Sequence, residues 1–156
     1  MDGLDRCYLS ALRILKVRFN SAAELKRKLL ARGFSRDEIA PAIERLTQEN
    51  WIDDLRFAGA YTRTRLLKRV GPLRIRRELI RAGVDDETIE LALAGNRDAD
   101  AERARALALA GRRLPILRRR YEERMARNKL TAYLLKQGYD AALVREIVKE
   151  ITVVHH

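Results

Sequence analysis

The side chains that could carry covalent or metal chemistry are few in this sequence of 156 residues. It contains one cysteine, Cys7, and two histidines, His155 and His156, which are either native or the remainder of a tag. A lone cysteine forms neither a disulfide framework nor a cysteine-ligated zinc site, and on a helical pattern it is typical of a small buried side chain. The adjacent Asp53 and Asp54 are typical of the N-cap and first turn of a helix. We therefore predict no enzyme activity, no catalytic residue, no metal site and no cofactor.

Basic side chains offer a second kind of chemistry, which is the binding of anions. The 33 Lys and Arg outnumber the 22 Asp and Glu and give a net charge of +11, which indicates a polyanionic or strongly acidic partner. Two basic runs contain no acidic residue, although ordinary solvated helices intersperse Glu at i,i+4. Arginine dominates them, and its guanidinium binds phosphate in a bidentate manner. The candidate contact residues are Arg63, Arg65, Lys68, Arg69, Arg74, Arg76 and Arg77 in the first run, and Arg112, Arg113, Arg118, Arg119 and Arg120 in the second.

Two other interpretations of these runs stay open at this stage. They could be solvated helix faces in which arginine serves helix formation and solubility. A turn between two helices could also resemble a helix-turn-helix, although no short polar recognition helix stands out. Each run surrounds an expected break between two helices, so the sequence predicts two basic corners at equivalent places.

The elements that must position these residues follow from an internal repeat. A helix–glycine–helix pattern occurs at residues 24–34, 74–84 and 129–139, with apolar residues at offsets that mark one helix face. Each copy ends in a glycine suited to a left-handed C-cap, then an apolar residue that closes the cap, then an N-cap residue. These triplets are Gly33-Phe34-Ser35, Gly83-Val84-Asp85 and Gly138-Tyr139-Asp140.

Local signals place the remaining helix ends. Ser21 with Glu24 and Ser35 with Glu38 have the spacing of capping boxes. An earlier helix fits each unit, at about residues 4–19 and 54–69 and from near Asp98. The third unit has an expected break at Gly111 to Pro115, and Pro41 predicts a bend or a slipped helix start.

The predicted fold is all-α: an elongated, curved, solenoid-like array of three tandem three-helix repeats. The repeats are expected at residues 1–53, 54–95 and 96–156, the last with an insertion after Pro115. Aromatic residues on apolar stripes are expected in the core, and Trp51 is expected to wedge the first two units together. The aromatic core candidates are Tyr8, Phe34, Phe57, Tyr61 and Tyr139. No apolar run approaches the roughly 20 residues of a membrane span, so we expect a soluble, cytoplasmic protein without a membrane partner.

The middle of the chain carries a resemblance to a known family. Residues 51–58 (WIDDLRFA), followed by residues 71–79 (GPLRIRREL) and Gly83, resemble the central signature of the RecX regulatory proteins. The resemblance covers essentially the whole chain, and the flanking repeats match less tightly.

The resemblance implies a bacterial cytoplasmic protein that binds the RecA recombinase filament on single- and double-stranded DNA. Such proteins usually inhibit ATP hydrolysis, strand exchange and co-protease activity, in DNA repair, homologous recombination and SOS control, although some members promote recombination. We expect a monomer. The alternative is a stand-alone helical DNA- or RNA-binding protein such as a transcription factor, and a RecA ATPase titration separates the two hypotheses.

Overall fold

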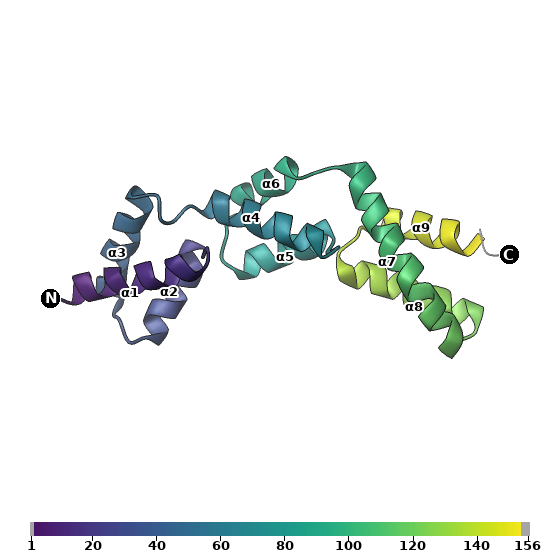
Figure 1. Ribbon diagram of the computed structural model, residues 1–156, viewed down its shortest axis with the longest axis horizontal. Helices are drawn as coiled ribbons and strands as arrows, with labels where there is room; N and C mark the ends of the chain where they lie inside the picture. The colour runs from purple at the N-terminus through teal and green to yellow at the C-terminus, as the bar shows by residue number, and fades with distance from the viewer. Residues whose placement is uncertain (1, 154–156) are drawn as a thin grey trace. The chain divides into compact units, whose positions relative to one another are not determined.

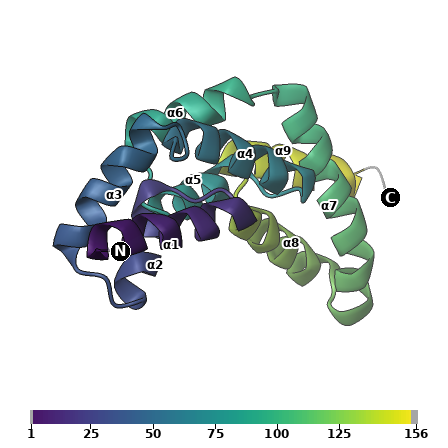
Figure 2. The same cartoon turned by 60° about the vertical axis from the view of Figure 1, so that its left-hand side comes forward.

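The computed structural model describes residues 2–153, so His155 and His156 lie outside the described residues. Within that range the chain forms helices and no strands, as Figures 1 and 2 show. The predicted all-α helical repeat fold is therefore confirmed. The helices are α1 (Gly3–Val17), α2 (Ala22–Ala31), α3 (Arg36–Gln48), α4 (Asp54–Leu67), α5 (Pro72–Arg81), α6 (Asp86–Gly95), α7 (Ala99–Arg120), α8 (Glu123–Gln137) and α9 (Ala141–Val153).

The helices begin at the polar residues that the sequence marks as N-caps. Ser21 and Ser35 both form complete capping boxes, in which the serine oxygen accepts from the N3 amide and the N3 glutamate accepts from the serine amide. Asp85 and Asp140 accept from the amides of Thr88 and Leu143 at 2.8 and 3.0 Å. Each of these bonds satisfies an amide that has no partner inside its own helix.

Three helices end at the predicted glycines. Gly33, Gly83 and Gly138 have φ values of +93°, +83° and +104°, in the left-handed region that glycine adopts at low cost. The residue after each glycine then donates its amide back to the helix, at 3.1–3.3 Å, as expected for a Schellman cap. These bonds are Phe34 to Leu29, Val84 to Leu79 and Tyr139 to Leu134.

The chain divides into two compact units. Unit 1 contains the residues up to Tyr61 together with Glu78–Ala92, and unit 2 contains Thr62–Arg77 together with the residues from Leu93 onward. In unit 1 the apolar stripes of α1, α2 and α3 form one core, whose fully buried members include Leu25, Leu29 and Leu46. In unit 2, α7, α8 and α9 form a second core. Its members include Leu114, Leu130, Leu134, Tyr139 and Ile147. The predicted repeat boundaries at residues 53 and 95 stay a prediction.

Within unit 1, the start of α2 packs on the end of α5, in a contact we call the α2–α5 joint. The Ser21 hydroxyl donates to the carbonyl oxygen of Ala82 at 2.6 Å, and the Ala22 amide donates to the Asp54 carboxylate at 2.9 Å. A Cβ added to Gly83 would lie 2.3 Å from the Cβ of Ala23, so the joint needs small residues on both sides.

Within unit 2, the start of α5 packs in the same way on the end of α8, in the α5–α8 joint. The Gly71 amide donates to the Gln137 carbonyl at 2.7 Å, and the Leu73 amide donates to the Gly138 carbonyl at 3.0 Å. The Tyr139 hydroxyl donates to the Arg69 carbonyl at 2.7 Å. Ser21 and Gly71 are 50 residues apart, and Gly83 and Gly138 are 55 apart, which are the shifts between copies of the repeat pattern. Equivalent positions of the repeat pattern therefore form equivalent contacts between helices, in addition to the helix pair within each copy.

Helix α7 departs from the predicted elements. The sequence predicts a break at Gly111 to Pro115, but α7 continues through both residues to Arg120, and the break falls at Tyr121 and Glu122. An interior proline costs a helix about 3 kcal/mol. Leu114 and Leu117 flank Pro115 and are 2% and 5% exposed in the core, so tertiary burial on both sides keeps the helix intact.

The predictions of a slipped helix start at Pro41 and of a wedge at Trp51 were also wrong, and the alternative of a bend at Pro41 stays a prediction. Helix α3 begins at Arg36 directly after its capping box and runs through Pro41, so its start is not slipped. Trp51 does not act as a buried wedge, because its side chain is 41% exposed whereas Ile52 is 5% exposed. Asn50 adopts a φ of +64°, and the amides of both following residues donate to the Leu46 carbonyl, a turn that leaves Ile52 in the core and Trp51 at the surface. Of the predicted core aromatics, Phe57 and Tyr139 are buried and the other three are partly buried.

Candidate functional site

All twelve predicted contact residues belong to unit 2. The first run surrounds the connection between α4 and α5, as expected, with Lys68 and Arg69 in the connection itself. Arg63, Lys68 and Arg77 are exposed and make no ion pair with any residue in 2–153. These three side chains are therefore available to an external anion.

The partly buried members of this run also serve the fold. Arg69 adopts a φ of +61°, unusual for a residue with a Cβ, and its carbonyl is held by the Tyr139 hydroxyl. Burial raises the pKa of Tyr139 to about 12, so the hydroxyl remains a donor at neutral pH. Arg74 donates from Nη1 to the side-chain oxygen of Gln137 at 3.4 Å, across the α5–α8 joint. Arg65 and Arg76 are likewise partly buried.

The second run lies on α7, so the prediction that it surrounds a break between two helices is only partly right. Arg112 and Arg113 sit in the middle of α7, because the helix continues through Pro115. Arg118, Arg119 and Arg120 form its last turn, where cations interact favourably with the helix dipole.

Arg118 is already engaged within the protein. Its guanidinium donates to Glu123 from Nη2 at 2.7 Å and from Nε at 3.0 Å, which makes a bidentate pair. These hydrogen bonds raise the pKa of Arg118 and lower the pKa of Glu123. Arg119 donates from Nε to the Pro115 carbonyl at 3.3 Å and makes no ion pair with the described residues. The cations of this run that make no ion pair with any residue in 2–153 are therefore Arg112, Arg113, Arg119 and Arg120.

The structure adds residues that the sequence interpretation missed. A groove of about 360 Å³ lies between α7 and α8, and it joins two members of the second run to side chains of α8 and of the connection. Its basic and aromatic lining consists of Arg113, Arg120, Tyr121, Lys129, Tyr133 and Lys136. Lys129, Tyr133 and Lys136 are spaced i, i+4, i+7, the spacing of one helix face, and this signal was available in the sequence.

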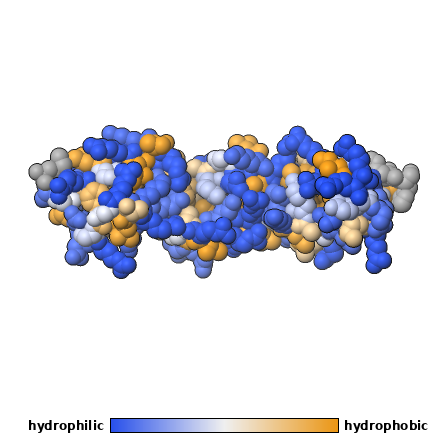
Figure 3. All heavy atoms as spheres, turned by 90° about the horizontal axis from the view of Figure 1, so that it is seen from below, coloured by the Kyte–Doolittle hydropathy of each residue, from blue (hydrophilic) through white to orange (hydrophobic). Residues whose placement is uncertain are grey.

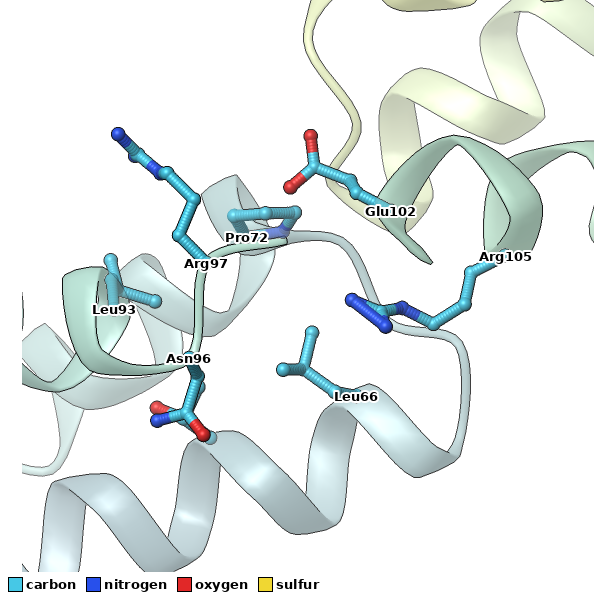
Figure 4. A pocket seen from close by; sticks show the side chains of 8 residues that line it. Leu66, Pro72, Leu93, Asn96, Arg97, Glu102 and Arg105 are labelled. Atoms are coloured by element: carbon cyan, nitrogen blue, oxygen red, sulfur yellow. The ribbon is translucent and has the colours of Figure 1, made fainter. Parts of the chain in front are cut away.

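A second hollow, shown in Figure 4, has a different character. Leu66, Pro72, Leu93 and the side chains of Asn96, Arg97, Glu102 and Arg105 line a space of about 10 Å³, enough for about one water molecule. Arg105 reaches from α7 toward Leu66, and Arg97 points away from the hollow (Figure 4). Burial raises the pKa of Glu102. This space is too small for a cofactor or a substrate.

The groups considered for catalysis have structural roles in the fold. The Asp53 carboxylate accepts from the amide of Arg56 at 3.0 Å, which is an N-cap bond, and Asp54 accepts from Ala22. Burial raises the pKa of Cys7, which keeps its thiol protonated and weakly nucleophilic. Between residues 2 and 153 no cluster of His, Cys, Asp and Glu could hold a metal ion, and no helix there has the length and apolarity of a membrane span.

One face of the molecule is mostly polar. Figure 3 shows one face of the molecule, on which hydrophilic residues predominate and hydrophobic residues occur in separate patches. Leu67 is 86% exposed and lies beside Lys68 at the end of α4. The basic corner therefore includes an apolar contact point as well as charge.

Comparisons with known proteins place the chain in a family. Residues 7–46 match the family model of the first three-helix domain of RecX, and residues 53–93 match the second. The regulatory protein RecX of Xanthomonas axonopodis pv. citri (strain 306) is 40% identical over 140 residues, covering 86% of this chain and 81% of the relative. That of Clostridium perfringens (strain 13 / Type A) is 33% identical over 152 residues, covering 97% of this chain and 71% of the relative.

Solved structures agree with these matches. The crystal structure of RecX from Lactobacillus salivarius has a TM-score of 0.83 at 25% identity, covering 97% of this chain and 98% of that one. A second crystal structure, of a regulatory protein RecX, has a TM-score of 0.85 at 24% identity, covering 96% of this chain and 72% of that one. From the identity to its relatives and the two matched domains, the chain belongs to the RecX family of regulatory proteins.

Proposed function

We propose that this protein binds the RecA recombinase filament on DNA and inhibits its ATP hydrolysis, strand exchange and co-protease activity, in DNA repair and SOS control. Membership of a family of regulatory proteins supports the regulatory part of this proposal. The protein would act by binding, in the cytoplasm, without catalytic chemistry of its own.

The observation that carries the nucleic-acid part is the set of exposed cations in unit 2 that have no acidic partner among the described residues. Arg63, Lys68 and Arg77 at the α4–α5 corner can engage phosphates without breaking an ion pair within residues 2–153. Each phosphate neutralised changes the slope of log affinity against log salt by about −0.7 to −0.9. Binding to a filament on DNA should therefore weaken steeply as salt rises.

The first experiment titrates the full chain into RecA assembled on single-stranded DNA and follows ATP hydrolysis. The expected result is a fall in turnover at amounts comparable to RecA. Unchanged turnover at stoichiometric amounts would overturn the proposal, and a rise would overturn the inhibitory sign.

The second experiment tests the corner directly. The triple variant Arg63→Glu, Lys68→Glu, Arg77→Glu should bind the filament more weakly while its helical content stays the same. A matched control reverses three exposed cations of unit 1, Arg13, Lys16 and Lys26, and makes the same change in net charge. An equal loss of affinity in both variants would show that total charge alone governs binding, and would contradict a specific role for the α4–α5 corner.

A stand-alone nucleic-acid-binding protein is the second candidate, because the same unpaired cations would serve free DNA or RNA. That function predicts salt-sensitive binding to nucleic acid with no effect on RecA turnover. The two titrations together separate the candidates.

A further inference from the structure

We propose that the groove between α7 and α8 is a binding site for single-stranded nucleic acid, with cations for the backbone and tyrosine rings for a base. This inference deepens the proposed function, on which it rests for the presence of DNA. The site is distinct from the α4–α5 corner, because α7, the α7–α8 connection and α8 supply its lining residues.

The groove concentrates positive charge. Arg113 and Arg120 come from α7, seven residues apart, and Lys129 and Lys136 come from α8, also seven apart, so two cationic helix faces border one space. Its lining includes no acidic residue. Such a space attracts a polyanion, and its low-dielectric walls strengthen that attraction.

The nearest acidic residues in the sequence are engaged elsewhere. Glu123 pairs with Arg118 at 2.7 Å and with Arg127 at 3.6 Å. Glu122 caps α8 by accepting from the amides of Met125 and Arg124 at 2.8 and 3.0 Å. Neither carboxylate forms an ion pair with a cation of the groove, and the four groove cations make no ion pair with any described residue.

Two tyrosines hold two of these cations in place. The guanidinium carbon of Arg113 lies 4.9 Å from the centroid of the Tyr133 ring, and Nζ of Lys129 lies 4.9 Å from the centroid of the Tyr121 ring. Cation–π contacts of this kind orient a cation without consuming its charge. Both rings are partly buried against the α7–α9 core, which limits their motion. The groove thus combines positioned cations with aromatic and guanidinium planes, the combination on which bases stack.

The requirement that a base reach the tyrosine rings favours a single strand over a duplex. The groove volume of about 360 Å³ is at the low end of the roughly 300–1,000 Å³ of small-ligand pockets. A paired base is enclosed in its duplex and would not reach the rings, whereas an unpaired base has both faces free. Ile116, 44% exposed, adds an apolar contact to the lining. An acidic peptide would satisfy the cations but would make no use of the tyrosines.

The test measures direct binding of the full chain to a fluorescent oligothymidylate and to a duplex of equal length, without RecA. Tyr133→Leu and Tyr121→Leu should each weaken single-strand binding by about 5- to 100-fold, the loss of one stacked base, and should change duplex binding little. Tyr133→Phe keeps the ring and should retain affinity. Lys129→Gln should reduce the magnitude of the salt slope by about 0.7. Lys149→Gln, at an exposed residue of α9 outside the groove lining, is the matched control and should leave base-dependent binding unchanged.

A crosslinking experiment guards against variants that fold poorly. Ultraviolet irradiation of the unmodified protein with 5-bromouracil single-stranded DNA should attach the nucleotide to peptides that contain Tyr121 or Tyr133. Crosslinks found only in other peptides would overturn the inference. It would also be overturned if the tyrosine variants lost as much affinity for the duplex as for the single strand, or if an acidic peptide bound more tightly and the tyrosine variants bound it equally well. The RecA ATPase titration tests the proposed function separately. Tyrosine-dependent binding of single-stranded DNA without an effect on RecA turnover would refute the proposed function and would leave the inference about the groove standing.

Discussion

The main chain at Gly71 packs directly against the main chain at Gly138. A Cβ on Gly71 would lie 2.3 Å from the carbonyl carbon of Gly138, and a Cβ on Gly138 would lie 2.5 Å from the Cβ of Arg74. The first turn of α5 is thereby seated on the last turn of α8, and the α4–α5 connection with its basic run is fixed within unit 2. The placement of the proposed DNA-binding corner thus depends on two residues that carry no side chain.

Gly138→Ala should destabilise the protein more than Gly33→Ala. Both glycines have positive φ, so alanine at either costs about 1–2 kcal/mol in the left-handed region. No atom lies within 4 Å of a Cβ on Gly33, whereas Gly138 is packed against α5, and such overpacking adds about 1–3 kcal/mol. Urea unfolding of both variants measures the difference, and equal losses would show that the α5–α8 joint yields without cost.

Tyr139→Phe should lower the free energy of unfolding at pH 7 by about 1 kcal/mol, because the Arg69 carbonyl loses its donor. Tyr8→Phe, whose hydroxyl bonds the exposed Glu49 carboxylate, is the control and should lose less.

The raised pKa of Tyr139 also predicts that the stability of the protein falls at alkaline pH. The pKa of Tyr139 in the folded protein, about 12, exceeds its ordinary value of 10, so its contribution to stability is complete below pH 10 and is lost as pH rises toward 12. Tyr139→Phe removes this titration, and its stability should fall less steeply between pH 10 and 12. Parallel curves for the two proteins would contradict the burial of the hydroxyl.

Pro115→Ala should stabilise the protein by up to about 3 kcal/mol, because α7 already holds helical geometry around a residue that lacks an amide donor. Pro72→Ala is the matched control. Pro72 is the first residue of α5, where proline suits the helix, so alanine there should bring no gain. Thermal unfolding measures both, and a loss of stability in Pro115→Ala would mean that the ring itself packs productively.

Asp54→Asn should gain stability over the wild type as pH rises from 4 toward neutrality. Burial raises the pKa of Asp54, whereas the hydrogen bond from the Ala22 amide lowers it. The nearby negative charges of Asp85, Asp53 and Glu24 raise it further. A raised folded pKa means that stability is complete below the unfolded pKa, about 4, and falls as pH rises through the folded pKa. Asparagine keeps an acceptor for Ala22 and removes the charge.

The control for this titration is Asp53→Asn, which preserves the N-cap bond to the Arg56 amide. Because the Asp53 charge contributes to the raised pKa of Asp54, this variant should flatten the pH curve only in part, whereas Asp54→Asn removes the titration itself. An Asp54→Asn curve parallel to the wild type between pH 4 and 7 would refute the raised pKa.

Local rules predicted the helix ends, since the serine capping boxes and the three left-handed glycines depend on residues within one turn. The rules were insufficient where distant packing decides. The burial of Leu114 and Leu117 carries α7 through Pro115, and the misplaced break concealed both the pairing of Arg118 with Glu123 and the groove beside it. The charge runs identified the candidate cations, but only the structure separates Arg63 and Arg77 at the surface from Arg69, which shapes its turn.

The α2–α5 and α5–α8 joints combine peptide groups and small residues with a few larger side chains that bond across them, among them Asp54 and Tyr139. The contacts that join neighbouring repeats are therefore separate from the exposed side chains that could bind a partner. A new binding surface could arise by exchanging outward-facing side chains, with no compensating change where the repeats meet.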